Sequence, residues 1–389
     1  MRVCLISVEI FAWGKYGGFG RATRIIGREL VRRGVSVTAV VPRRKGQASI
    51  EELDGIRVLS FRSRDLLSAS QLYRQADADI YHSQEPSLGT YLAMHAMPER
   101  KHVVTFRDPR DAEDWRTELR LPSVSPAQVI ANWIYEDNWL VSGAVRRADA
   151  LFAAAQMIVP KAKAKYHLPA DPEFLPTPVP VPEQIKKAPT PTVCFVSRWD
   201  KRKRPEIFFE LAKAFPKVRF LAAGQSRNRE WDEHLRTSYA DVPNLEMLGF
   251  IDQFRSDELN KVMDQSWILV NTAAREGLPN AFIEAAAHGC AILSAVDPDG
   301  FASRFGQLVI NDDFVGGLEA LLANDTWREK ASRGYAYVKE VFSLDKAIDR
   351  HLTIYERLIT NNPKISTKES NKDDEKDNKT SEVIGRGNA

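Results

Sequence analysis

The stretch Arg2-Val3-Cys4-Leu5-Ile6-Ser7 recurs 190 residues later as Thr192-Val193-Cys194-Phe195-Val196-Ser197. Both are short apolar runs that end in a serine and lead through a polar loop into a helical pattern. Each half of the chain therefore starts as a βα unit, and further strand-like runs alternate with helical stretches, as a parallel α/β sheet requires. These further runs lie at 35–41, 56–61, 80–82, 102–106 and 150–154, and again at 219–223, 245–248, 268–271 and 291–294. The sequence predicts an α/β fold of two doubly wound domains that face each other across a cleft.

A proline-rich stretch, LPTPVPVPEQIKKAPTPT at 175–192, separates the two halves. Its prolines exclude both a helix and a central strand, so we expect an interdomain linker there. The expected boundaries are an N-terminal domain at 1–182, a linker at 183–191 and a second domain at 192–342.

The end of the chain has two parts. Apolar residues at helical spacing follow Ser343, which can cap the helix, and they predict a last amphipathic helix at 343–360. Residues 361–389 are nearly free of large apolar side chains and dense in mixed charge. Such a segment cannot offset its ordering entropy, so we expect a disordered tail.

Composition excludes several classes of protein. A chain of 389 residues predicts about two globular domains, and 55 basic against 52 acidic residues are too balanced for a chain built around nucleic acid. No apolar run reaches the roughly 18 residues of a membrane span, and the opening run is broken by Glu9 and lacks a cleavage-site pattern. The three cysteines are far apart in apolar runs. They indicate reduced, buried side chains of a cytoplasmic protein rather than a metal site or a disulfide frame.

A glycine loop, Gly17-Gly18-Phe19-Gly20-Arg21, lies between the first strand and a helix that runs to about Arg33. Glycines let the backbone approach a ligand closely, and the helix N-terminus beyond them attracts an anion. The spacing does not fit the dinucleotide fingerprint G-x-G-x-x-G. The loop is therefore either an anion site or a structural turn.

The second domain has a basic loop, SRWDKRKRP at 197–205, after its first strand. Pro205 is well placed to open the next helix. Five cations within seven residues would repel one another unless an anion or the solvent separates them. A solvated loop is one interpretation, but a place at the carboxyl end of a parallel strand favours a diphosphate site.

Two carboxylates with seven residues between them lie in the segment that begins at Asn271: Glu276 in a loop and Glu284 in the helix after Pro279. Both can reach one elongated ligand, and the N–H groups of Asn280 and Ala281 lie where a helix terminus would meet phosphate. Alternatively, Glu276 is a cap and Glu284 a surface residue. The apolar neighbours of Glu284 argue against the surface, because a carboxylate in such company needs a partner.

Together these motifs resemble the retaining glycosyltransferases of family 4, which have the GT-B fold. The resemblance covers about residues 1–360, and its most specific part is the Glu276-x7-Glu284 element with Gly277-Leu278-Pro279-Asn280. It implies two Rossmann-like domains, an acceptor-side domain followed by a nucleotide-sugar domain. The helix at 343–360 would cross back and complete the first domain.

The resemblance implies a role for each matching residue. Arg198 and Lys203 would neutralise the diphosphate of a nucleotide-sugar as it leaves, an electrostatic form of catalysis that needs no metal or other cofactor. Glu276 would hold hydroxyls of the donor sugar, and Glu284 would accept hydrogen bonds from the ribose. The expected catalytic residues are Glu276, Arg198 and Lys203. The expected donor-binding residues are Gly17, Gly18, Arg198, Lys203, Phe250, Ile251, Gly277, Leu278, Pro279, Asn280, Ala281 and Glu284.

The implied reaction moves a hexose-type sugar from a nucleoside diphosphate, UDP or GDP, with retention of configuration. The acceptor is a glycan, a lipid-linked molecule or a small molecule. In this reading the backbone of Phe250 and Ile251 reads the base, while Gly17 and Gly18 approach the distal phosphate from the first domain.

One residue departs from the family pattern. Arg107 stands at the end of a strand, in VVTFRD, where the family commonly has a histidine close to the reacting sugar. Arginine can bind a phosphate or an acidic acceptor but cannot shuttle a proton. We expect Arg107 and Arg21 on the acceptor side. The departure leaves open a catalytically silent partner subunit that binds nucleotide-sugar, and a sugar-nucleotide epimerase on the same fold is a further alternative.

Two other patterns need interpretation. Asp77-Ala78-Asp79 matches the D-x-D motif of metal-dependent glycosyltransferases of another fold, but an isolated tripeptide favours a structural role. Arg21, Arg24, Arg28 and Arg32 share one helix face. That face is either solvated or docks on an anionic membrane, where a lipid-linked acceptor would be found.

Overall fold

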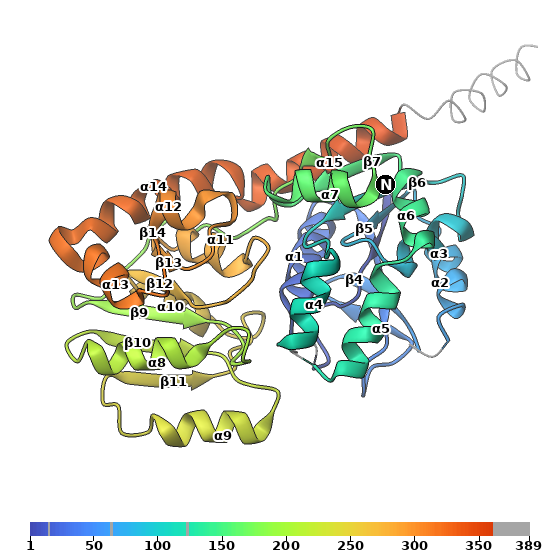
Figure 1. The fold of residues 1–389 in the computed structure, drawn as a ribbon. Helices are drawn as coiled ribbons and strands as arrows, with labels where there is room; N and C mark the ends of the chain where they lie inside the picture. The colour runs from blue at the N-terminus through green and yellow to red at the C-terminus, as the bar shows by residue number, and fades with distance from the viewer. Residues whose placement is uncertain (15, 63–64, 122–123, 361–389) are drawn as a thin grey trace, which may run out of the picture.

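The computed structural model describes residues 1–14, 16–62, 65–121 and 124–360 (Figure 1). The expected disorder of 361–389 lies outside these residues. The chain forms two α/β units, each built on its own sheet and covered by helices (Figure 1). No helix in the described part of the chain is both long and apolar enough to cross a membrane.

The first sheet has eight strands in the order β3-β4-β2-β1-β5-β6-β7-β8. All neighbours are parallel except β3, which pairs antiparallel with β4 at the edge. The strands are β1 (Arg2–Ile6), β2 (Ser36–Pro42), β3 (Ile50–Leu53), β4 (Ile56–Phe61), β5 (Ile80–Ser83), β6 (Lys101–Phe106), β7 (Ala150–Ala153) and β8 (Glu173–Phe174). The helices of this unit are α1 (Gly18–Arg32), α2 (Ser68–Ala76), α3 (Leu88–Ala96), α4 (Ala112–Arg120), α5 (Pro126–Glu136), α6 (Trp139–Arg146) and α7 (Ile158–Tyr166).

The second sheet has six parallel strands in the order β11-β10-β9-β12-β13-β14. The strands are β9 (Thr192–Val196), β10 (Arg219–Ala223), β11 (Leu245–Gly249), β12 (Ile268–Asn271), β13 (Ala291–Ser294) and β14 (Gly306–Leu308). The helices are α8 (Pro205–Ala214), α9 (Arg229–Ser238), α10 (Glu258–Gln265), α11 (Asn280–Ala287), α12 (Phe301–Phe305), α13 (Phe314–Leu322) and α14 (Thr326–Val341), with 3₁₀ turns at Pro298–Gly300 and Ala323–Asp325.

The repeated opening strands occupy equivalent places. β1 lies between β2 and β5, and β9 lies between β10 and β12. In both sheets the next strands are added first on one side of the opening strand and later on its other side. Ligands of such sheets bind at this switch point, outside the carboxyl ends of the strands. The fold predicted from the sequence is confirmed, including every strand that it predicted.

Three strands were not predicted: β3, β8 and β14. β3, with the sequence IEEL, lies at the edge of the first sheet and alternates exposed with half-buried residues. An edge strand needs no apolar run, because only one side of its backbone pairs.

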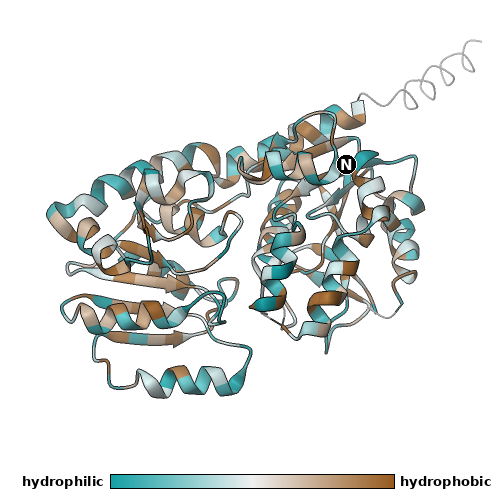
Figure 2. Cartoon of the chain, viewed as in Figure 1, coloured by the Kyte–Doolittle hydropathy of each residue, from teal (hydrophilic) through white to brown (hydrophobic). Residues whose placement is uncertain are grey.

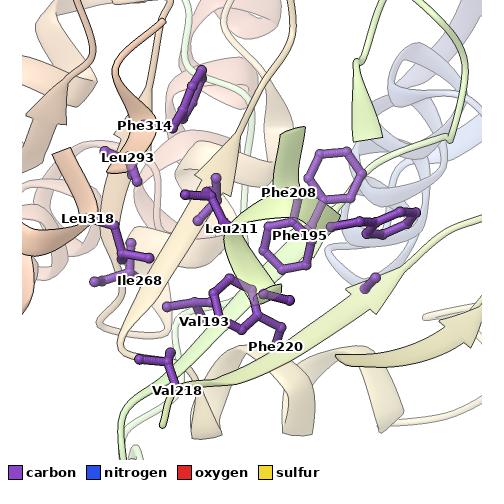
Figure 3. Close-up of a cluster of buried hydrophobic side chains, with 14 of the residues drawn as sticks. Val193, Phe195, Phe208, Leu211, Val218, Phe220, Ile268, Leu293, Phe314 and Leu318 are labelled. Carbon is purple, nitrogen blue, oxygen red and sulfur yellow. The ribbon is translucent and has the colours of Figure 1, made fainter. Parts of the chain in front are cut away.

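Each sheet packs its apolar residues against helices. In the second unit, Phe195 of β9 stacks with Phe208 of α8 at a ring distance of 5.3 Å (Figure 3). Both side chains are fully buried within one cluster. Figure 2 shows the same division along the chain, with apolar residues concentrated in the strands.

The last helix, α15 (Leu344–Thr360), returns to the first unit. Arg33 at the end of α1 binds Asp345 at 2.6 Å and Asp349 at 2.7 Å. The Tyr355 hydroxyl lies 2.6 Å from Nδ1 of His82 on β5. α14 and α15 run one after the other along the two units (Figure 1), so the end of the chain ties them together.

Candidate active site between the two domains

Two helices start at the same place from opposite domains. α1 begins after Gly17, and α11 begins at Asn280 after Pro279. The Asn280 side chain donates a hydrogen bond to the Gly18 carbonyl at 2.9 Å. Because helix N-termini carry unpaired N–H groups and a partial positive charge, their meeting places two partial positive charges together between the domains.

Glu9 lies beneath the glycine loop. Its Oε1 accepts a hydrogen bond from the Gly20 amide at 3.0 Å, and a Cβ atom on Gly17 would come within 2.0 Å of the same oxygen. Gly17 is therefore required for this close approach. The sequence analysis did not identify Glu9 as a functional residue, although it follows β1 directly, at the carboxyl end of the sheet.

Lys203 and Glu276 form an ion pair in the cleft, with 12% and 13% of their side chains exposed. Burial lowers the pKa of Lys203, the charge of Glu276 opposes this shift, and the charge of Arg198 adds to it. Arg198 itself contacts Asp200 at 3.2 Å. The structure thus brings the three expected catalytic residues together.

Two further cations of the basic loop are paired with carboxylates, one from each domain. Arg202 pairs with Glu118 of α4, and Arg204 pairs with Asp312 at 2.8 Å. The repulsion within the loop is thus reduced by acidic side chains distant in the sequence, which a single sequence does not reveal. The diphosphate site expected at this loop stays a prediction.

Two further arginines contribute charge to this place. Arg44 follows β2, and Arg227 follows β10. The pKa of Arg227 is lowered first by burial and then by the charge of Arg198. Burial also lowers the pKa of Arg44. The sequence analysis missed both, although their positions just beyond the carboxyl ends of strands could have revealed them.

Glu284 is buried, so the interpretation of this residue as a surface carboxylate is excluded. It forms an ion pair with Arg21 of α1 across the domain boundary. A pocket of about 220 Å³, including its open mouth, lies among Arg21, Asn280, Glu284 and Thr177. Glu284, which is expected to bind the donor, is therefore paired with Arg21 of the other domain in this structure, in which the two domains are in contact.

Arg107 lies inside the first domain. Its guanidinium donates to Thr177 Oγ1 at 2.7 Å and to Gln84 Oε1 at 2.6 Å, and burial lowers its pKa to about 10. The carboxylate of Glu85 accepts a hydrogen bond from the Arg107 amide at 2.6 Å, and burial raises the pKa of Glu85 to about 8. The Arg107 carbonyl lies 3.2 Å from where a Cβ atom of Gly277 would stand. Arg107 is thus placed against the loop that carries Glu276.

Arg275, next to Glu276, joins the domains. It donates to the two carboxylate oxygens of Asp108 at 2.7 and 3.0 Å and to Asp114 of α4. Burial alone would raise the pKa of Asp114, but hydrogen bonds from Arg275 and Lys161 outweigh it and lower this pKa to about 2. The sequence analysis did not identify Arg275, because its partners are 161 and 167 residues away.

An aromatic cluster covers one end of the cleft, where the base is expected. The ring of Phe250 lies 4.6 Å from that of Tyr16 and 6.4 Å from that of Phe11. Phe250 remains partly exposed and Ile251 half-buried. Leu278, Pro279 and Ala281 lie at the start of α11 and are half-buried.

The basic face of α1 is only partly solvated, because Arg32 is exposed at the end of the helix while Arg21 and Arg24 are covered. Arg24 is buried, binds Asp54 at 2.6 Å and lies 4.0 Å from the ring centre of Phe254 in the second domain. Arg21 is held by Glu284, so α1 presents no continuous basic surface to a membrane.

Asp77 and Asp79 have structural partners. Arg2 contacts them at 2.6 and 3.1 Å, at the amino end of the first sheet and away from the cleft. Among the described residues, no group of three or more His, Cys, Asp or Glu side chains is arranged to hold a metal ion.

Comparison with known proteins identifies the family. Residues 16–181 match the profile of Glycosyltransferase Family 4, and residues 190–324 match that of Glycosyl transferases group 1. No curated protein sequence matches the chain significantly.

Solved structures share the fold. Sucrose-phosphate synthase from Thermosynechococcus elongatus superposes with a TM-score of 0.71 at 15% identity, over 92% of this chain and 99% of that one. HepE from Anabaena, solved with UDP-glucose, gives 0.67 at 14% identity, over 90% and 99% of the two chains. The catalytic domain of starch synthase IV from Arabidopsis thaliana gives 0.63 at 11% identity, over 92% and 99%. With its two Rossmann-like domains in the GT-B arrangement and both family domains in order, the chain belongs to the group 1, family 4 glycosyltransferases.

Proposed function

We propose that this glycosyltransferase moves a hexose-type sugar from a nucleoside-diphosphate donor to its acceptor, with retention of configuration and without a metal. The observation that carries the proposal is the meeting of Arg198, Lys203 and Glu276 with the N-termini of α1 and α11. A departing diphosphate develops negative charge, and fixed cations and helix termini stabilise it. The HepE structure with UDP-glucose supports a nucleotide-sugar donor of this kind.

The ion pairs of the closed cleft suggest how the donor binds. A diphosphate that approaches Lys203 replaces the carboxylate of Glu276 as its partner. Glu276 is then released to accept hydrogen bonds from sugar hydroxyls. In the same way, a ribose that binds Glu284 releases Arg21 toward the acceptor side. In each exchange the hydroxyl groups of the donor replace the cation as hydrogen-bond partners of the carboxylate, which reduces the cost of breaking the buried ion pair.

Retention of configuration requires no protein nucleophile in this scheme. The leaving phosphate oxygen assists deprotonation of the acceptor on the same face of the sugar. Arg107 lies against the loop that carries Glu276. It cannot take the proton of the acceptor, because its guanidinium group stays charged. We place the protein in the cytoplasm because its cysteines Cys4, Cys194 and Cys290 are free and buried.

A panel of nucleoside diphosphates and their sugars, screened by thermal shift, tests donor binding. Ligands that bind only the folded state raise its melting temperature. Release of nucleoside diphosphate from the stabilising donor, followed by the anomeric configuration of the product, then tests turnover and retention. Activity that persists after chelation of divalent cations is expected, and loss of activity would contradict metal independence.

A second function has one observation in its favour. Arg107 replaces the histidine of the family and is bound to Thr177 and Gln84, which suits a silent subunit that binds nucleotide-sugar without transfer. Donor binding without diphosphate release, with any acceptor offered, would establish this alternative. Conversion of the bare donor to an isomeric nucleotide-sugar would instead establish an epimerase.

A further inference from the structure

Exposed apolar side chains gather on one edge of the first domain. Among the described residues between 119 and 139, six large apolar residues are exposed to solvent. They lie at the end of α4, on α5 and at the start of α6, which Figure 1 shows at one edge of the domain. They are Leu119, Leu121, Ile130, Trp133, Ile134 and Trp139. Isolated exposed apolar residues are ordinary, whereas a contiguous group marks a surface that contacts something other than water.

The outward face of α5 is apolar along its length. Ala127, Ile130, Ala131 and Ile134 are all exposed and follow one another at helical spacing. One flank of the helix packs on α4, where Trp133, itself still partly exposed, stacks with Trp115 at a ring distance of 5.9 Å. The helix is therefore held by α4 on one side while its other side faces solvent.

No charge interrupts this apolar face. The first charged residue of α5 is Glu136 near its end, and Glu136 is paired with Arg110 at 2.9 Å. The next acidic residue, Asp137, is paired with Lys165 at 2.6 Å. The local carboxylates are thus neutralised by neighbours from the same domain.

The charges left beside the apolar face are mainly basic, because the exposed side of α4 carries two arginines and one carboxylate, Glu113. Arg116 and Arg120 on α4 are exposed, stand four residues apart on one side of the helix and form no ion pair within the described residues. Trp139, which is 79% exposed, follows α5 directly. Isoleucine and tryptophan beside arginine are typical of a protein surface that enters the headgroup region of a bilayer, where arginine meets anionic lipid.

We propose that the outward face of α5, with Trp139 and the Arg116 and Arg120 edge, docks on an anionic lipid bilayer. A second copy that met this surface with the same surface would oppose Arg116 and Arg120 with the same two arginines, and their repulsion disfavours that contact. The opposite side of α4 holds Asp114 and Glu118, which pair with Arg275 and Arg202 of the second domain. The bilayer would therefore lie beside the cleft, on the acceptor side. This docking is independent of the proposed transfer reaction.

Vesicle co-sedimentation of the full chain, without donor, tests the proposal. The protein is expected to sediment with vesicles of phosphatidylcholine mixed with phosphatidylglycerol and at least tenfold less with phosphatidylcholine alone. The double variant Ile130→Ser/Ile134→Ser should bind the mixed vesicles at least tenfold more weakly, since each apolar side chain removed lowers the partition constant. Arg116→Glu/Arg120→Glu should abolish the preference for anionic lipid.

Ile310→Ser is the matched control, because Ile310 is 63% exposed and Ile134 is 62% exposed, but Ile310 lies in the second domain. It should bind vesicles as the wild type does, and all variants should keep the wild-type melting temperature because their side chains are exposed. Failure of the wild type to bind either vesicle, or undiminished binding of Ile130→Ser/Ile134→Ser, would overturn the proposal. So would a concentration-dependent dimer that this double variant abolishes in the absence of vesicle binding.

Discussion

The ion pair of Lys203 and Glu276 allows a structural role to be separated from a catalytic one. Only 12% and 13% of the two side chains are exposed, so Lys203→Met leaves Glu276 charged and poorly solvated. Breaking a buried pair costs about 3 to 5 kcal/mol, and the remaining access to water brings our expectation down to about 2 to 3 kcal/mol. This corresponds to a decrease in melting temperature of roughly 5 to 10 °C for a domain of this size. Glu276→Gln should have a similar effect.

The double variant Lys203→Met/Glu276→Gln removes both charges together. Its stability should return to within about 1 kcal/mol of the wild type, which gives a coupling energy of about 3 to 5 kcal/mol in the double-mutant cycle. Turnover should behave differently. We expect release of nucleoside diphosphate to fall by more than about tenfold in all three variants, because each loses groups that act on the transition state.

A matched surface pair provides the control. Lys213 and Glu210 contact each other at 2.9 Å with 46% and 56% of their side chains exposed, so the same cycle there should give a coupling below about 1 kcal/mol and unchanged turnover. A cleft double variant as unstable as Lys203→Met alone would refute the pairing argument. Wild-type turnover in any cleft variant would refute the assignment of the catalytic residues.

Three further variants test other contacts. Burial raises the pKa of Glu85 from 4.5 to about 8, so folded protein keeps a proton that the unfolded chain releases, and stability falls as pH rises through this window. Glu85→Gln should flatten that fall in melting temperatures measured across the same range, and an unchanged profile would contradict the burial argument. Arg275→Gln removes the bonds to Asp108 and should increase the radius of gyration in small-angle X-ray scattering, whereas an unchanged radius would show that other contacts suffice. Arg24→Ala should cost about 2 to 4 kcal/mol in chemical denaturation because it breaks a buried pair, while Arg32→Ala, at an exposed side chain, should stay within about 0.5 kcal/mol, and equal effects would refute this difference.

The features that the sequence predicted are those that depend on local pattern. The alternation of apolar runs with helical stretches placed the strands, because buried parallel strands must be nearly continuous in apolar residues. The start of α11 after Pro279 followed from the same reasoning, since proline suits the beginning of a helix. The strand β3 was not predicted because it is a polar edge strand without an apolar run.

Contacts between distant residues were not predictable in the same way. Glu9 supports the glycine loop only because the chain turns back after β1, and the sequence gives no indication that its carboxylate stands under Gly17. Arg275 and Asp108 lie 167 residues apart and meet only when the domains close. A single sequence identifies which residues carry charge, whereas the fold decides which charges are partners.

The helices α1 and α5 show that periodicity does not predict whether a helix face is buried or exposed. Helical spacing groups the arginines of α1 on one face, yet Asp54, Glu284 and the ring of Phe254 cover it, so most of a charged face is removed from water. On α5, helical spacing groups isoleucine and alanine on a face that is exposed. Periodicity states which residues share a face, and the neighbouring domain or membrane decides what that face meets. A charged face that is buried requires partners, and on α1 these come from the closure of the two domains. An apolar face that is exposed requires a binding surface, and on α5 this is the surface on which the helix docks.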